Sequence, residues 1–296
     1  RNFGFILFFV IIFAIFLAAP AILNADDYKI QSLRANIEIE ANGDMVVTER
    51  WVVQYPEGYS VSYRDISFQK YNPDNPLYQE QSNQADFEID LENDVWVAGA
   101  DGRKLDKGRY YVRKSGQRDE RGEIIECYPN RSKCESIFIH VPSGFDEKMT
   151  FGYKYRIKGA VTKYQDIAEL NWVFLDYFET TVRNLEFRIT LPGIPKDDIL
   201  VWGHGTAGSI TIEENQVLIS VDKLKKQEVL ELRILMPEDK FSVPNTNYIE
   251  RSMKQTIIDY EMRLAEETNR RIAIAQLVFY GTFAMLALMI VMVYIA

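Results

Sequence analysis

The stretch YKIQSLRANIEIEANGDMVVTERWVVQY, residues 28–55, decides the fold. Apolar and polar residues alternate through it on both sides of Asn42-Gly43, a dipeptide that readily adopts the positive φ angles of a tight hairpin turn. An alternation with a period of two places every second side chain on the same face of a strand. The stretch therefore predicts a β-hairpin with one buried face.

Further alternating runs follow along the chain, among them ADFEIDLENDVWVAG (85–99), MTFGYKYRIKGAV (149–161) and LEFRITL (185–191). Segments rich in Gly, Pro, Asn and Asp separate them, as turns require. A parallel α/β fold would need helices between the strands, and we expect just one short helix, around residues 164–170. The pattern predicts a mainly β domain over residues 26–242, built as an antiparallel β-sandwich.

The C-terminal stretch IAIAQLVFYGTFAMLALMIVMVYIA, residues 272–296, carries no charge. A helix of that length, at about 1.5 Å per residue, exceeds the roughly 30 Å hydrocarbon core of a bilayer. No soluble helix needs to be apolar on every side. The stretch therefore predicts a transmembrane helix, and we expect the natural protein to continue beyond Ala296.

An amphipathic pattern precedes this apolar stretch. Ile249, Met253 and Ile257 recur every four residues, which is one stripe of a helix. Asn247 is placed to cap that helix, and Glu250 is placed to complete a capping box. Residues 247–271 are therefore predicted to form a juxtamembrane stalk helix.

The N-terminal residues 1–25 contain an uncharged apolar segment, residues 3–23. Its length fits both a secretory signal peptide and an N-terminal membrane anchor. In either case the β-rich domain is expected on the extracytoplasmic side of the membrane. That compartment is oxidising, so Cys127 and Cys134 are expected to form a disulfide, with free thiols as the alternative.

The charge balance and the motifs exclude several classes of function. With 34 basic and 43 acidic residues the net charge is −9, which argues against nucleic-acid binding. The stretch GHGTAG, residues 203–208, satisfies G-x-G-x-x-G, but the alternating run that follows it has no helical stripe to face a pyrophosphate. We therefore expect no nucleotide, no cofactor and no metal site, and no enzyme.

The stretch GAVTKYQDIAELNWVF, residues 159–174, brings Asp166, Glu169 and Trp172 close together in sequence. Two acids beside an indole allow three interpretations. The first is a capped helical turn that leads into a buried strand, with Asp166 near the start of the turn. The others are an interaction surface and a pair of catalytic carboxylates.

The sequence also resembles the N-terminal domain of YciQ-type predicted bacterial membrane proteins, domain of unknown function 2207. The resemblance rests on Tyr28, Ile30, residues 42–44, Glu49, Arg50, residues 63–66, Tyr155, residues 159–161, Tyr164, Asp166, residues 169–172, Asn184, Leu191 and Pro192. It implies a bacterial plasma-membrane protein with a signal segment, an extracytoplasmic β-rich domain and a transmembrane helix. It implies no catalytic residues.

Together these features predict a membrane-anchored extracytoplasmic binding or interaction domain. Its expected partners are the lipid bilayer and an envelope or membrane protein. Two alternatives remain: an envelope carbohydrate hydrolase that uses paired carboxylates, and the outer domain of a transmembrane sensor or scaffold.

Overall fold

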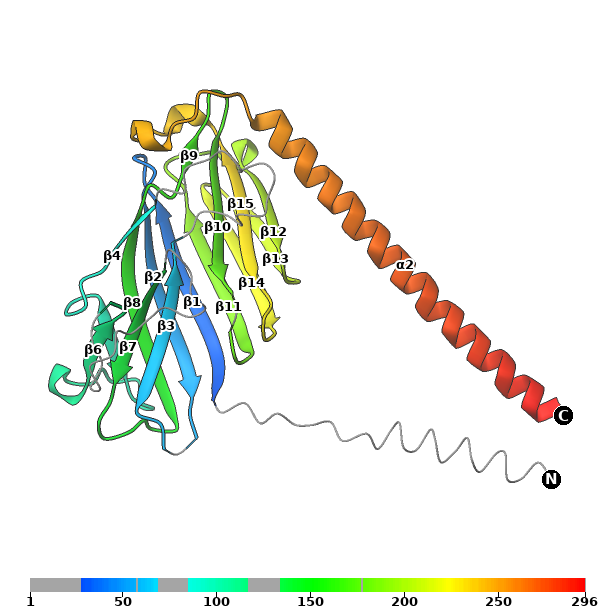
Figure 1. Ribbon diagram of the computed structural model, residues 1–296, viewed down its shortest axis with the longest axis horizontal. Helices are drawn as coiled ribbons and strands as arrows, with labels where there is room; N and C mark the ends of the chain where they lie inside the picture. Colours follow the sequence, from blue (N-terminus) through cyan, green and yellow to red (C-terminus); the bar gives the residue numbers. More distant parts are fainter. Residues whose placement is uncertain (1–27, 57, 69–84, 117–133, 177, 296) are drawn as a thin grey trace.

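The computed structural model describes residues 28–56, 58–68, 85–116, 134–176 and 178–295 (Figure 1). The N-terminal apolar segment and Cys127 lie outside the described residues. The strands are β1 Lys29–Ile39, β2 Met45–Gln54, β3 Val61–Ser67, β4 Asp86–Glu88, β5 Val95–Ala98, β6 Tyr111–Lys114, β7 Cys134–His140, β8 Lys148–Lys158, β9 Thr162–Lys163, β10 Ala168–Leu175, β11 Val182–Thr190, β12 Leu200–His204, β13 Ser209–Glu213, β14 Gln216–Leu224 and β15 Leu230–Met236. They are followed by the helix α2, Lys254–Ile295.

The strands form three sheets. The largest has eight strands in the order β13-β14-β11-β1-β2-β8-β4, with β5 also paired to β8. A four-stranded sheet has the order β12-β15-β10-β9, and a three-stranded sheet has the order β3-β7-β6. The predicted mainly β, sandwich-like fold is confirmed. One pair departs from the antiparallel pattern, because β1 and β11 run parallel, with Ile37 opposite Ile189.

One continuous hydrophobic core joins the three sheets. On β2 the buried side chains alternate with exposed or half-buried ones, so that Met45, Val47, Trp51 and Val53 share the core face. Ile137 and Ile139 of β7 reach the same core, and so do apolar residues of β10 and β15. The two smaller sheets therefore both pack against the large sheet.

The hairpin predicted from residues 28–55 forms as β1 and β2. Its turn lies at Gly43, whose φ of +87° belongs to the left-handed region that favours glycine. A side chain there would also collide with Val243, because a Cβ atom added to Gly43 would lie 2.7 Å from Val243 Cγ1. The turn thus lies directly against the segment that leads to α2.

The prediction of a short helix around residues 164–170 is wrong. Residues 164–167 form a tight turn, in which the Tyr164 N–H donates to the Ile167 carbonyl at 2.8 Å, and β10 begins at Ala168. The burial of both faces of β10, from Ala168 to Trp172, explains the preference for a strand. Two neighbouring strands, β9 and β15, satisfy its backbone groups.

The stalk and the apolar stretch form one uninterrupted helix, α2, which begins at Lys254 and not at residue 247. Asn247 ends a short 3-10 turn, Asn245–Asn247, so the prediction that it caps the helix is wrong. The cap comes from Asp166 instead, which lies 87 residues away from Met253 in sequence. Its carboxylate accepts the Met253 N–H at 2.8 Å and the Lys254 N–H at 3.3 Å.

Within the described part of the chain, the contacts between α2 and the β domain are made by the first turns of the helix. Met253 and Ile257 are buried against Tyr164, Ile167 and Leu235. Farther along, the helix leaves the domain (Figure 1). Its large apolar side chains there, among them Leu277, Phe283 and Ile290, are exposed to a degree unusual for hydrophobic residues. Among the described residues, α2 is the one helix that is long and apolar enough to span a bilayer.

Substitution of Gly152 on β8 tests how tightly the large sheet is packed. A Cβ atom at this position would lie 1.9 Å from Trp96 Cε2, which belongs to the neighbouring strand β5. We expect Gly152→Ala to lower the free energy of unfolding by about 1–3 kcal/mol, because the tryptophan has to move. Chemical denaturation of the full chain in detergent measures this, with Gly108→Ala as the control, since no atom lies within 4 Å of that Cβ position. Equal effects of the two substitutions would contradict the packing described.

Candidate functional site

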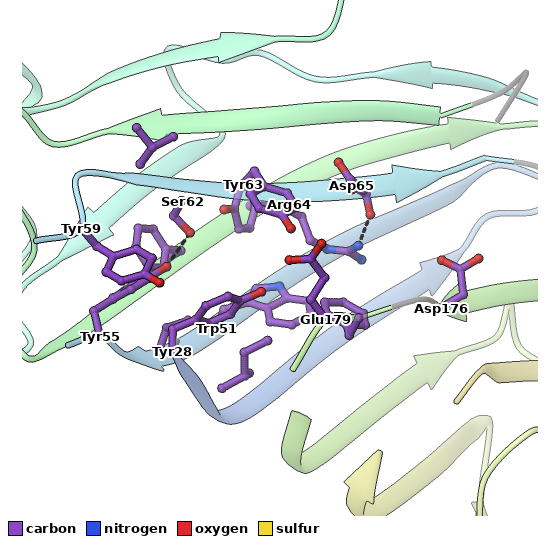
Figure 2. A pocket seen from close by; sticks show the side chains of 16 residues that line it. Tyr28, Trp51, Tyr55, Tyr59, Ser62, Tyr63, Arg64, Asp65, Asp176 and Glu179 are labelled. Carbon is purple, nitrogen blue, oxygen red and sulfur yellow. Dashed lines mark hydrogen bonds between the residues drawn. The ribbon is translucent and has the colours of Figure 1, made fainter. Parts of the chain in front are cut away.

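A pocket lies at the end of the sandwich where β2 ends and where β1 and β3 begin (Figure 2). Its cavity volume is about 100 Å³. A single water needs about 10–15 Å³ by this kind of measure, so the cavity has room for a small group of several heavy atoms. It is the candidate functional site because strands of two sheets hold its walls in place.

Half of the residues that line the pocket are aromatic. Tyr28 and Tyr55 stack with ring centroids 5.8 Å apart, and Tyr59 lies 5.5 Å from Tyr55. Trp51 stacks on Phe178 at 5.4 Å. Figure 2 shows the three tyrosines grouped on one side of the pocket. These rings offer a ligand both flat apolar surfaces and phenolic hydroxyl groups.

Three carboxylates, those of Asp65, Asp176 and Glu179, complete the lining. Together with burial, two of them, Glu179 and Asp65, raise the pKa of neighbouring tyrosines. Burial, followed by the charge of Glu179, raises the pKa of Tyr28 to about 12. Burial, followed by the neighbouring Tyr28 and Glu179, also raises the pKa of Tyr63. The tyrosine hydroxyls therefore remain neutral hydrogen-bonding groups at physiological pH.

A buried ion pair between Glu49 and Arg64 lies directly behind the pocket. Arg64 Nε donates to Glu49 Oε2 at 2.9 Å, and Arg64 Nη2 donates to Glu49 Oε1 at 2.8 Å. Trp51 Nε1 and the Tyr155 hydroxyl each donate a further hydrogen bond to the same carboxylate at 2.7 Å. The guanidinium also lies 5.0 Å from the Trp51 ring centroid, within the range of a cation–π contact.

The electrostatics of this pair follow from its surroundings. Glu49 is 3% exposed and Arg64 is 6% exposed. Burial opposes ionisation of Glu49, but the charge of Arg64 and the donated hydrogen bonds outweigh it, so the pKa of Glu49 lies below its ordinary value. Both groups are therefore charged, and each neutralises the other inside the core.

The alternation of the sequence contained a signal for this pair that the sequence analysis missed. Glu49 occupies a core-face position of β2, between Val47 and Trp51. Arg64 occupies a core-face position of β3. A charged residue at an inward position of a strand needs a partner of opposite charge, and these two residues satisfy that need for each other.

The structure separates the three residues predicted as one cluster. Asp166 caps α2. Glu169, which is 2% exposed, faces the helix side of the four-stranded sheet and pairs with Arg233. Trp172 is 2% exposed and belongs to the main core. Successive β10 side chains point to opposite faces, so Glu169 and Trp172, three positions apart, do not share one surface.

A second buried charge network attaches α2 to the domain. Arg233 of β15 lies with its Nε 3.1 Å from Glu169 Oε1, and its Nη1 donates to Glu261 of α2. Arg233 and Glu261 are each 1% exposed. The Tyr164 hydroxyl donates to Glu169 at 3.0 Å. We call Glu169, Arg233 and Glu261 the helix clamp.

Two further groups extend the helix clamp. His204 of β12 lies with Nε2 3.2 Å from Glu261 Oε2, and it is directly opposite Glu231 of β15 in the ladder. Burial raises the pKa of Glu231, and Glu261 adds to this effect, whereas His204 and Arg233 oppose it. Glu231 is thus a carboxyl group whose charge is disfavoured where it lies, in contrast to Glu49.

Comparison with known proteins places the chain in a family. The model of the predicted membrane protein (DUF2207) N-terminal domain matches residues 29–236. The chain belongs to this family. The match begins at the first residue of β1 and ends at the last residue of β15, so it covers the β domain and stops before α2. No curated protein is significantly similar to the chain.

Three solved structures show a weak similarity of fold. They are a putative protease from Parabacteroides distasonis (12% identity, 71% of this chain and 40% of that chain, TM-score 0.38), a putative nutrient binding protein from Legionella pneumophila (11%, 70% and 67%, TM-score 0.38) and native leukotriene A4 hydrolase from Saccharomyces cerevisiae (10%, 76% and 32%, TM-score 0.36). The chain thus spans about two fifths of the first of these proteins. Similarity at this level carries no argument about function.

Two glutamates are predicted to have opposite effects when replaced by glutamine. The lowered pKa of Glu49 means that its ionised form stabilises the fold above a pH of about 4.5 and that this stabilisation is lost as the pH falls. We expect Glu49→Gln to lower the free energy of unfolding at pH 7 by about 3 kcal/mol, and by less in acid. The raised pKa of Glu231 has the opposite sign, so Glu231→Gln should increase stability at pH 7.

Urea denaturation of both variants and of the unaltered chain, at pH 7 and at pH 4, measures these differences. The two variants carry the same chemical change, so each serves as the control of the other. Destabilisation by both substitutions at pH 7 would contradict the electrostatic assignment of Glu231.

The helix clamp makes a prediction of its own. Glu261→Ala leaves the buried Arg233 without one of its two carboxylates, so we expect the free energy of unfolding to fall by about 3–5 kcal/mol. Thermal unfolding of the full chain in detergent measures the loss. Glu266→Ala is the matched control, because Glu266 is exposed on the same helix. A loss no greater than that of the control would show that the clamp contributes nothing.

Proposed function

We propose that this chain is a membrane-anchored binding domain that faces the extracytoplasmic side and captures its ligand in the aromatic pocket. The observation that carries the proposal is the pocket itself, with a cavity of about 100 Å³ lined by tyrosines, a tryptophan and carboxylates. A concave site lined by hydrophobic and aromatic side chains, with a few polar groups, is the usual form of a small-molecule binding site.

The walls of the pocket are held in position before any ligand arrives. Trp51 is fixed by its hydrogen bond to Glu49 and by the Arg64 guanidinium over its ring. The Tyr55 hydroxyl donates to Ser62 Oγ at 2.7 Å, which ties the end of β2 to the start of β3. A site that needs little ordering loses little affinity on binding, so this rigidity favours a binding role.

The proposed membrane anchoring and orientation rest on features of the sequence. The apolar part of α2 provides the anchor, and the N-terminal residues 1–25 would direct the domain across the membrane. The predicted bridge between Cys127 and Cys134 belongs to the same proposal, with Cys134 at the start of β7. An impermeant amine-reactive reagent that fails to label the β domain on intact cells would disprove this orientation.

The proposal assigns no catalytic step to the predicted carboxylates. Asp166 accepts backbone N–H groups of α2, and Glu169 is almost fully buried beside Arg233. A glycosidase needs two carboxyl groups that flank a substrate across a gap, and these two are committed to structural contacts. The hydrolase alternative therefore loses its main candidates.

A sensor or scaffold role is the second candidate, and the helix clamp favours it. The clamp and the Asp166 cap hold the start of α2 on the β domain through buried ion pairs and backbone hydrogen bonds. A domain attached in this way would move the membrane-spanning helix together with itself. This role needs no change to the proposed pocket, since ligand capture would be its input.

Site-specific photocrosslinking tests the proposal. A photoreactive amino acid replaces Tyr63 at the rim of the pocket, where the native side chain is 43% exposed. The same replacement at Tyr248, which is 40% exposed and lies away from the pocket, is the matched control. We expect irradiation of intact cells to give an adduct from position 63 and a much weaker one from position 248, because ligands concentrate at the pocket.

Adducts of equal yield at both positions would show that the domain has no preference for the pocket. The absence of any adduct at position 63, in a variant that folds as judged by its thermal unfolding, would likewise overturn the proposal.

A further inference from the structure

The direction of α2 places the pocket toward the membrane. The helix begins beside Asp166, at the end of the sandwich that carries the Gly43 turn. Its contacts then run from Asp166, just before β10, to Arg233, which lies opposite Asn171 in the middle of that strand. The far end of β10 leads to Asp176 and Glu179 of the pocket. The helix therefore runs from the hairpin end toward the pocket end.

The lengths of the elements agree with this placement. The part of α2 from Lys254 to Arg271 precedes the apolar stretch and is roughly 27 Å long at 1.5 Å per residue. The strand β10, with 8 residues, spans roughly 26 Å. In Figure 1 the helix slants away from the sandwich and descends toward the lower side of the view, where β1 begins. Along the helix axis, the apolar stretch thus starts near the level of the pocket end.

The rim of the pocket carries side chains that suit a membrane surface. Val61 is 40% exposed and Tyr63 is 43% exposed, both on β3. Tyrosine and tryptophan are favoured at the level of lipid head groups, where one part of the ring system is apolar and another is hydrated. The pocket end therefore presents an aromatic and apolar surface toward the bilayer.

The charge of the lining selects for a cation. Asp65, Asp176 and Glu179 contribute carboxylates. That of Asp65 already accepts a hydrogen bond from Ser136 Oγ, whereas Glu179 is exposed at the rim. Arg64 is the cationic side chain among the described residues of the lining, and its charge is compensated by Glu49. The faces of the surrounding aromatic rings are themselves electron-rich and attract cations. A ligand that carries a positive charge thus complements the pocket, whereas an anion would be repelled.

From the cavity, its charge and its place above the apolar helix, we infer that the pocket binds an organic ammonium group, supplied by the head group of a membrane lipid. The ammonium group enters among Tyr28, Tyr55 and Tyr59, near the Glu179 carboxylate. The cavity of about 100 Å³ suits such a small group better than a whole oligosaccharide. The inference rests on the proposed binding function and adds the class of ligand.

A lipid titration tests the inference. The full chain in detergent is titrated with phosphatidylethanolamine, with phosphatidylglycerol of the same acyl chains, and with free ethanolamine, and binding is followed by calorimetry. We expect phosphatidylethanolamine to bind at least roughly tenfold more tightly than phosphatidylglycerol, which lacks the ammonium group. Free ethanolamine should bind more weakly than the lipid, because it lacks the contacts of the bilayer-facing rim.

A pair of variants links the binding to the pocket. Glu179 is exposed at the rim, so Glu179→Gln should leave the fold intact while weakening phosphatidylethanolamine binding by roughly tenfold. Glu213→Gln is the control, because Glu213 is an exposed glutamate on β13, an edge strand of the large sheet, and does not line the pocket. The affinity of the Glu213→Gln variant for phosphatidylethanolamine should not change.

Three results would overturn the inference. Equal binding of the two lipids would exclude an ammonium-selective pocket. Equal binding of free ethanolamine and the lipid would exclude the lipid as the source. An unchanged affinity of Glu179→Gln would place the binding elsewhere. In each case, if the photoreactive residue at position 63 still forms its adduct, the proposed binding function holds. Only the assignment of the ligand as an ammonium-bearing lipid is then refuted.

Discussion

The buried ion pair between Glu49 and Arg64 is the interaction on which the architecture of the pocket depends. Glu49 belongs to the eight-stranded sheet and Arg64 to the three-stranded sheet, so the pair joins the two layers through the core. Removing two charges from water is costly unless each has a well-aligned partner. Here one carboxylate accepts four hydrogen bonds. The directions of these hydrogen bonds fix the relative orientation of the two sheets. Hydrophobic packing alone is less directional and would define that orientation less sharply.

The same physical solution recurs where α2 meets the four-stranded sheet. Arg233 joins Glu169 of its own sheet to Glu261 of α2, again with all three side chains out of contact with water. The strand β10 links the two regions, since Glu169 lies near its start and Asp176 follows its end. A ligand that displaces the end of β10 therefore acts on the strand that also holds the helix clamp. This continuity is the structural basis of the sensor alternative.

The sequence predicted the features that depend on local periodicity. The hairpin at Gly43, the alternating strands and the apolar helix all follow from patterns within a few residues of one another. It could not predict the Asp166 cap on α2, because that contact depends on a tertiary approach between segments 87 residues apart. The spacing of Asp166 and Glu169 suggested a helical turn, but pairing with β9 and β15 imposes a strand from Ala168 onward.

The candidate site is harder to predict because its residues come from separate strands. Tyr28, Tyr55 and Tyr63 each look like ordinary strand residues, and only the assembled sheets bring their rings together. In the assembled sheets, burial raises the pKa of all three tyrosine hydroxyls. Because these hydroxyls stay protonated at physiological pH, they contribute hydrogen bonds but no charge, and the carboxylates of the lining set the sign of the pocket. In the proposed binding role the two tasks are separate: aromatic rings give the cavity its shape, and the acidic side chains favour a positively charged ligand.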